Sequence, residues 1–308
     1  ADLTDGGCQE VAASLIDSTK QSIRRLERMT GKEQKVLNAL SSAGIAECVD
    51  RLIGYICGQV LVPRISNERS WDAVSETNNV VQMLVRFLAQ PKLKAKTRGA
   101  GKLASSLRQL EDMVNSIIDR LLDAVVQRLK TILAEQRKSD FKRGGGAVDS
   151  SDENDELIDV SVSELCRRVC ELLRTEMIRI KSALDSKNLT SVQEDLAVRF
   201  HAHLVQNVHR FEYSQSGALA MLQDIGEYKR IVTDYIAPDS ALAHKLMSTL
   251  QQLMNLLVAQ PETLEQLVIE QRTTKLIGDQ IITSFVNLRM DQKSSGMKKP
   301  EWLQRITG

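Results

Sequence analysis

The sequence predicts an all-α protein in which consecutive antiparallel helical bundles form an elongated rod. Aromatic residues make up 4% of the 308 residues, and the chain has only 16 glycines and 5 prolines. That is a lean composition for a sandwich or barrel, which needs aromatic and β-branched strands with frequent turns. Apolar residues recur at helical spacing along most of the chain, and the prolines fall between these periodic segments.

The first half of the chain contains four periodic segments, which predict helices over about 9–29, 30–61, 71–90 and 103–138. Thr30 and Glu33 have the spacing of a capping box at the start of the second segment. Gly54 and Gly58 are expected to weaken or break that segment. The longest segment carries two neighbouring apolar stripes, so we expect more than one helix to cover it. We assign residues 1–143 to a first helical bundle.

Composition changes abruptly after Lys138. Three glycines at 144–146 precede a run over 149–159 that contains six acidic residues and no cation. Such a segment is typical of a flexible linker. We therefore predict an acidic flexible loop over 144–160, with a second helical bundle over 161–308.

The second half resumes with helical patterns whose first residues resemble helix caps. Ser161 with Glu164, and Ser191 with Glu194, have capping-box spacing, and Asp239 is an N-cap candidate. The segments that follow carry continuous apolar stripes, as do two later ones; the predicted starts are near 161, 191, 217, 239, 261 and 277.

One basic segment is the candidate contact site. The segment over 92–102 carries five cations, and no acidic residue occurs between Pro91 and Leu110; the cations are Lys92, Lys94, Lys96, Arg98 and Lys102. They are suited to contact an anionic lipid surface or an acidic partner, at about 1 kcal/mol for each cation near a membrane. A solvated loop between helices is the ordinary alternative. The net charge of +1 and the lack of aromatic residues within the segment give no reason to expect nucleic acid as a partner.

The cysteines and histidines do not suggest an enzyme. The five cysteines are an odd number and are typical of reduced, buried thiols in a cytoplasmic protein. Cys166 and Cys170 share a helix face, but a zinc site needs two more ligands and none is spaced nearby. No catalytic motif occurs, so we predict neither enzymatic activity nor a cofactor. We find no leader and no run of ~18 apolar residues, which agrees with a cytoplasmic location.

Five blocks in sequence carry a resemblance to a known family; they cover 129–141, 182–189, 196–201, 224–229 and 284–289. The first reads LKTILAEQRKSDF, and the last two read DIGEYK and SFVNLR. In order and spacing these blocks resemble the C-terminal helical-bundle part of the Sec-ten family (exocyst complex component five). The resemblance is clear over about residues 120–292 and weaker over 1–119.

This resemblance implies a function and a set of partners. Family membership implies a helical rod of the vesicle-tethering type, which acts as a non-enzymatic scaffold and tethers secretory vesicles to the plasma membrane before fusion. The implied partners are other exocyst subunits, above all the Sec-fifteen subunit, and an Arf-type small GTPase. Family members are longer, so the chain is expected to be a C-terminal fragment. Two alternatives remain, which are a module that binds anionic membrane surfaces through the basic segment at 92–102 and a subunit of another helical-rod tethering complex.

Overall fold

The computed structural model describes residues 7–29, 47, 49, 51–63, 70–88, 101–142, 162–184, 186–273 and 278–291. The prediction of an all-α fold is confirmed, because the β structure in these residues is limited to an isolated bridge between Tyr213 and Arg289. The chain divides into two compact units, residues 1–123 with 179–185 and residues 124–178 with 186–308. The bounds predicted from sequence for two bundles, 1–143 and 161–308, stay a prediction. The acidic segment at 144–160 lies outside the described residues.

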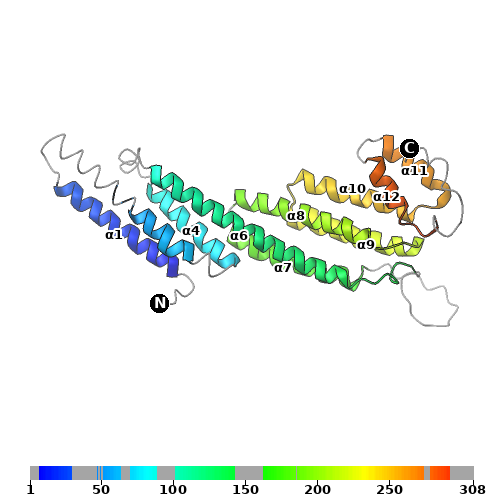
Figure 1. Cartoon of the computed structure of the whole chain (residues 1–308), viewed down its shortest axis with the longest axis horizontal. Helices are drawn as coiled ribbons and strands as arrows, with labels where there is room; N and C mark the ends of the chain where they lie inside the picture. The colour runs from blue at the N-terminus through cyan, green and yellow to red at the C-terminus, as the bar shows by residue number, and fades with distance from the viewer. Residues whose placement is uncertain are drawn as a thin grey trace. The chain divides into compact units, whose positions relative to one another are not determined.

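The first unit contains α1 (Gly7–Met29), the π-helical turn η1 (Ile56–Leu61), α4 (Trp71–Leu88) and the first part of α6 (Gly101–Ala134). Helices α1 and α4 lie side by side (Figure 1). The backbone N–H of Cys8 donates to the buried Glu76 carboxylate at 3.0 Å, so a side chain of α4 caps the first turn of α1. Gly58 does not break its helix, because residues 51–63 stay helical and change to π geometry at η1.

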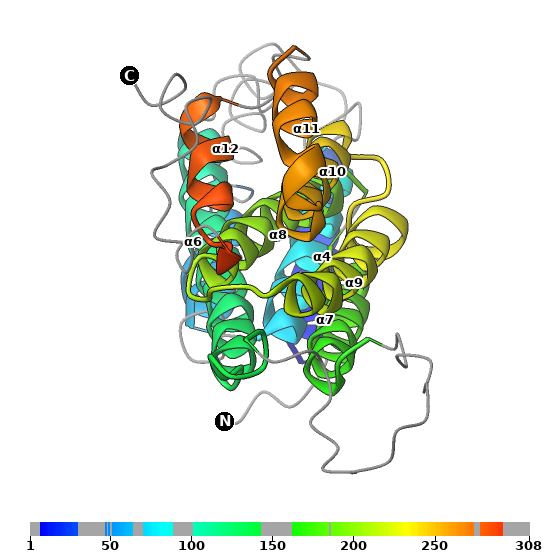
Figure 2. The ribbon, with the colours of Figure 1, turned by 90° about the vertical axis from the view of Figure 1, so that its right-hand side faces the viewer.

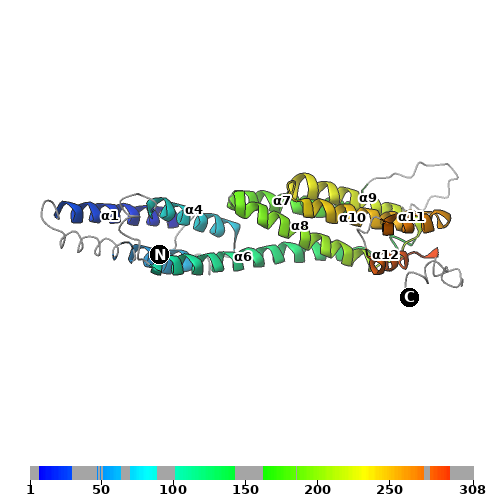
Figure 3. The same cartoon turned by 90° about the horizontal axis from the view of Figure 1, so that it is seen from above.

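The second unit contains the end of α6, the part of α7 (Glu164–Ala183) up to residue 178, and the later helices. These later helices are α8 (Ser186–Val208), α9 (Gln215–Ile231), η2 (Val232–Ile236), α10 (Ala241–Val258), α11 (Pro261–Thr273) and α12 (Asp279–Val286). Helices α9 and α10 lie side by side (Figures 2 and 3), and α8 and α12 also contact α10. The fully buried rings of Phe200 and Tyr228 meet edge to face at 5.5 Å between centroids. The apolar stripes therefore face inward as the periodicity predicts.

The starts of α7 and α8 differ from the predicted ones. Helix α7 begins at Glu164, and the hydroxyl of Ser163 accepts the N–H of Cys166 at 3.0 Å. Ser161, the predicted cap, lies outside the described residues. Helix α8 begins at Ser186, so the prediction that Ser191 opens this helix is wrong. A capping box identifies a helix start only when the chain before it is not helical, and here the helix extends further back.

The start of α10 also differs from its prediction by one residue. Ser240, not Asp239, is the N-cap, and its hydroxyl accepts the N–H of Ala243 at 3.1 Å. The same hydroxyl donates to the Glu194 carboxylate of α8. This contact selects Ser240 over its neighbour, because it also satisfies a carboxylate on a helix that packs against α10.

Candidate functional site

The structure leaves the predicted basic segment untested. Lys92, Lys94, Lys96 and Arg98 lie outside the described residues, and the side chain of Lys102 in the first turn of α6 is likewise outside them. The polar side chains that the structure brings together lie instead in the second unit. They form three buried contact sites and a pair of salt bridges, and all of these join segments that are distant in sequence.

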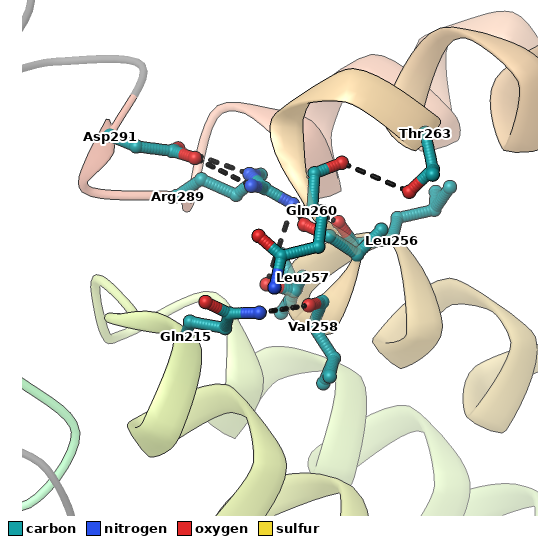
Figure 4. Close-up of polar contacts among 9 residues, drawn as sticks. Gln215, Leu256, Leu257, Val258, Gln260, Thr263, Arg289 and Asp291 are labelled. Atoms are coloured by element: carbon teal, nitrogen blue, oxygen red, sulfur yellow. Dashed lines mark hydrogen bonds and ion pairs between the residues drawn. The ribbon is translucent and has the colours of Figure 1, made fainter.

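The first site, here called the C-terminal clasp, comprises Arg289, Asp291 and the end of α10 (Figure 4). The Arg289 side chain is 4% exposed, and its Nη1 donates to the carbonyl oxygens of Leu256 and Ala259, both at 2.7 Å. Its Nε and Nη2 donate to the two carboxylate oxygens of Asp291. The last carbonyls of a helix lack intrahelical donors and carry partial negative charge. The clasp supplies both the missing donors and a cation.

Main-chain contacts extend the clasp to the turn between α8 and α9. The N–H of Tyr213 donates to the Leu288 carbonyl at 2.9 Å, and the N–H of Met290 donates to the Tyr213 carbonyl at 3.0 Å. The Gln215 side chain, at the start of α9, donates to the Val258 carbonyl at 3.2 Å (Figure 4). Three parts of the chain are therefore held together here, namely the α8–α9 turn, the end of α10 and the segment after α12.

The second site, the aromatic node, comprises Phe141, Phe211 and Tyr213. The Phe141 ring lies 4.9 Å from the ring of Phe211 and 5.2 Å from that of Tyr213, centroid to centroid. The Phe141 carbonyl accepts both the N–H and the hydroxyl of Ser214, at 3.0 and 3.1 Å. The node attaches the segment after α6 to the N-terminus of α9, because Ser214 is also the N-cap of that helix.

The third site, the buried polar cluster, comprises Ser163, Cys166, Cys170, Asp224 and Tyr228. Ser163 donates to the Asp224 carboxylate through its N–H at 2.8 Å and its hydroxyl at 2.6 Å. Burial raises the pKa of Asp224, and the two hydrogen bonds from Ser163 oppose that rise only in part. The buried Tyr228 hydroxyl has no hydrogen-bond partner among the residues that the structure describes, and burial raises its pKa well above the ordinary value.

Two salt bridges connect the end of α6 with α7 inside the second unit. Arg128 pairs with the buried Glu176 at 2.7 Å, and Arg168 pairs with Glu135 just after α6. The hydrogen bond from Arg168 lowers the pKa of Glu135. The partner numbers rise on one segment as they fall on the other, which requires an antiparallel arrangement. Each segment carries its arginine before its glutamate along the chain. The antiparallel arrangement therefore places opposite charges against each other at both positions, which favours this register over a shifted one.

The described cysteines confirm the prediction of buried thiols. Cys8, Cys57, Cys166 and Cys170 are free and buried, and Cys48 lies outside the described residues. In the part of the chain that the structure describes, no three His, Cys, Asp or Glu side chains gather as a metal-binding group. No helix among the same residues has the length and apolarity needed to cross a bilayer.

Comparison with known proteins identifies the family. Residues 9–300 match the family model described as "Exocyst complex component Sec10-like, alpha-helical bundle". The chain belongs to this Sec10-like family of exocyst components. The family that the sequence blocks suggested is thereby confirmed.

Among curated Sec10-like relatives, exocyst complex component 5 of Homo sapiens is 28% identical over 315 residues, which cover 94% of this chain and 41% of that protein. The Caenorhabditis elegans protein of the same name is 24% identical, with 93% and 44% covered. The chain thus spans about two-fifths of the length of these relatives. Among solved structures, the C-terminal domain of the exocyst subunit Sec6p aligns with a TM-score of 0.47 and 10% identity, over 96% of this chain and 77% of that one.

Each of the three contact sites includes at least one residue from the blocks that resembled the Sec10-like family. Phe141 ends the first block, Asp224 and Tyr228 lie in the block at 224–229, and Arg289 ends the last block. The sequence pattern gave no role to Arg289 or Asp224 within these blocks, nor to Gly217 outside them. The position of the blocks was the available signal, because the contact partners of these residues lie 30 to 76 residues away in the chain.

Proposed function

We propose that this chain is the scaffold part of an exocyst subunit, which acts without catalysis and helps tether secretory vesicles to the plasma membrane through protein–protein contacts. The family match over residues 9–300 carries the proposal. It favours the exocyst over other helical-rod tethering complexes. The three contact sites support a scaffold role, since their polar groups point inward and hold helices together.

The proposal is tested by affinity purification from cells followed by mass spectrometry, with the tagged chain beside the tagged full-length natural protein. We expect the full-length protein to recover the other exocyst subunits. Gly226→Ala should retain the same partners, whereas Gly217→Val, which overfills the contact with Phe141, should lose the partners that need a folded second unit. Recovery of no exocyst subunit by either wild-type form would overturn the proposal.

The finer proposal on partners concerns the Sec-fifteen subunit and an Arf-type small GTPase. It rests on the family alone and is tested with purified components. We expect the Sec-fifteen subunit to bind directly in pull-down, and the GTPase to bind in its GTP-loaded form in preference to its GDP-loaded form. Equal binding of the two nucleotide forms would remove the GTPase from the proposal.

A second candidate function uses Lys92, Lys94, Lys96, Arg98 and Lys102 at an anionic membrane surface, and would help recruit the protein to the plasma membrane. The observation that favours it is the absence of any acidic residue over 91–110. Co-sedimentation with vesicles that contain an anionic lipid should fall when the first three lysines are changed to glutamate. Unchanged sedimentation of that variant, or equal binding to neutral vesicles, would contradict it.

A further inference from the structure

An exposed turn follows α6 in the second unit and lies between two buried residues. The four residues 137–140 are all exposed, whereas Gln136 before them and Phe141 after them are buried. The Gln136 side chain accepts a hydrogen bond from the Asn207 amide of α8 at 2.5 Å, and Phe141 belongs to the aromatic node. The turn is therefore presented to solvent from a fixed base.

Ser139 in this turn is flanked by cations. Arg137 and Lys138 precede it, and Lys142 follows it three residues later. The Arg137 and Lys138 side chains are exposed and make no ion pair with any residue that the structure describes. These two cations are available to an acidic surface on another protein, because no contact within the described chain has to be broken first.

Two other hydroxyls have a stronger basic pattern in the sequence but a different structure. Thr131 and Ser182 each follow an arginine by three residues, namely Arg128 and Arg179. Both hydroxyls lie in helices, where they donate to the carbonyls of Gln127 and Arg179 at 3.0 and 2.8 Å. A kinase binds its acceptor in an extended segment, so these helices must first unfold locally. An exposed turn needs no such step.

The Asp140 carboxylate holds the turn in its present form. It accepts the Ser139 hydroxyl at 3.3 Å and the Arg137 N–H at 2.9 Å. A phosphate ester on Ser139 removes the hydroxyl donor and places about two negative charges beside this carboxylate. Repulsion then weakens the hydrogen bond to Arg137. The next residue, Phe141, accepts the Ser214 N–H at the N-cap of α9, so the change reaches that helix start.

We infer that Ser139 is a phosphorylation site for a serine kinase with an acidic substrate groove, and that the phosphate opens the turn by repelling Asp140. The γ-phosphoryl group of Mg²⁺–ATP is transferred. A bond forms between the Ser139 Oγ and phosphorus, the bond from that phosphorus to the β–γ bridging oxygen breaks, and ADP leaves. The hydroxyl proton passes to the catalytic carboxylate of the kinase. The inference does not depend on the proposed function.

The test of the site is incubation of the folded chain with Mg²⁺–ATP and the catalytic domain of protein kinase C, which accepts cations on both sides of a serine. Mass spectrometry should locate phosphate on Ser139 and none on Thr131. A synthetic peptide of residues 125–145, which has no fold to protect it, should also accept phosphate on Thr131. Changing Arg137 and Lys138 to alanine should slow transfer at least about 10-fold. Absence of phosphate on Ser139, or equal rates at Thr131 in chain and peptide, would overturn the inference.

Hydrogen exchange of the phosphorylated chain tests the effect on the turn. The amides of Arg137 and Ser214 should exchange about fivefold faster, as expected for the loss of one hydrogen bond. Asp140→Asn keeps an oxygen acceptor and removes the charge, so it should cancel this increase. Ser139→Ala loses the hydroxyl without adding charge and should leave both amides unchanged. Unchanged exchange after phosphorylation, or an equal increase in Ser139→Ala, would overturn the role of repulsion by Asp140.

Discussion

Gly217 of α9 lies against the main chain of Phe141, so closely that a Cβ at this position would stand 2.6 Å from the Phe141 carbonyl carbon. The approach lets the N-cap Ser214 donate to the Phe141 carbonyl while its own oxygen accepts the Gly217 N–H at 3.1 Å. Glycine is therefore required here by a close backbone contact. The contact lies where the segment after α6 meets α9.

Gly217→Ala should destabilise the second unit by about 1–3 kcal/mol, because the added methyl overlaps backbone that cannot rotate away. Gly226, in the same helix, is the matched control, because a Cβ there meets nothing within 4 Å. Gly226→Ala should stabilise the protein by about 0.5–1 kcal/mol through the helix preference of alanine. Urea unfolding measures both, and equal effects of the two substitutions would contradict the assignment.

Arg289→Met should cost about 2–4 kcal/mol of unfolding free energy, because it removes the hydrogen bonds that the buried guanidinium donates to the Leu256 and Ala259 carbonyls and to the Asp291 carboxylate. Arg289→Lys should recover only part of the loss, since a lysine cannot reproduce the forked contact. Arg167→Met, which breaks an exposed pair with Glu164, is the control and should have little effect. Hydrogen exchange should rise at the end of α10 in the Arg289 variants alone.

Asp224→Asn should remove a pH dependence of stability. Burial raises the pKa of Asp224 above its ordinary value of 3.8, so the folded chain holds this proton more tightly than the unfolded chain. Stability from this group is therefore full below pH 3.8 and is lost as pH rises through the folded pKa. Relative to the asparagine variant, the wild type should lose stability as pH increases from about 4 towards neutrality. A constant difference across that range would show that the carboxyl does not titrate differently on folding.

Glu176→Ala should destabilise the protein more than Glu135→Ala, although each carboxylate pairs with an arginine. The Glu176 side chain is 4% exposed, and that of Glu135 is 49% exposed and screened by water. The loss for Glu176 should be about 1–3 kcal/mol. Added salt should reduce the effect of Glu135→Ala, and exchanging the charges of Glu135 and Arg168 should restore stability. Failure of that exchange would argue against their pairing.

Helix positions were partly predictable from sequence, and the contact sites were not. The segment over 9–29 was predicted within two residues of α1, and 71–90 ends two residues after α4. Ser240 replaced Asp239 as a cap because it also donates to Glu194, which is 46 residues away. A capping pattern describes only the next few residues and carries no information about such a partner.

The sequence by itself determined the helical class, the inward faces of the helices and the family, because these depend on periodicity within a few turns and on ordered blocks of residues. Tertiary structure alone decided that Arg289 caps α10, that Asp224 holds Ser163 and that Gly217 admits the Phe141 backbone. The physical reason is that a polar group is satisfied by whichever partner packing brings within about 3 Å. That partner is chosen by the folded chain as a whole, across separations of 30 to 76 residues.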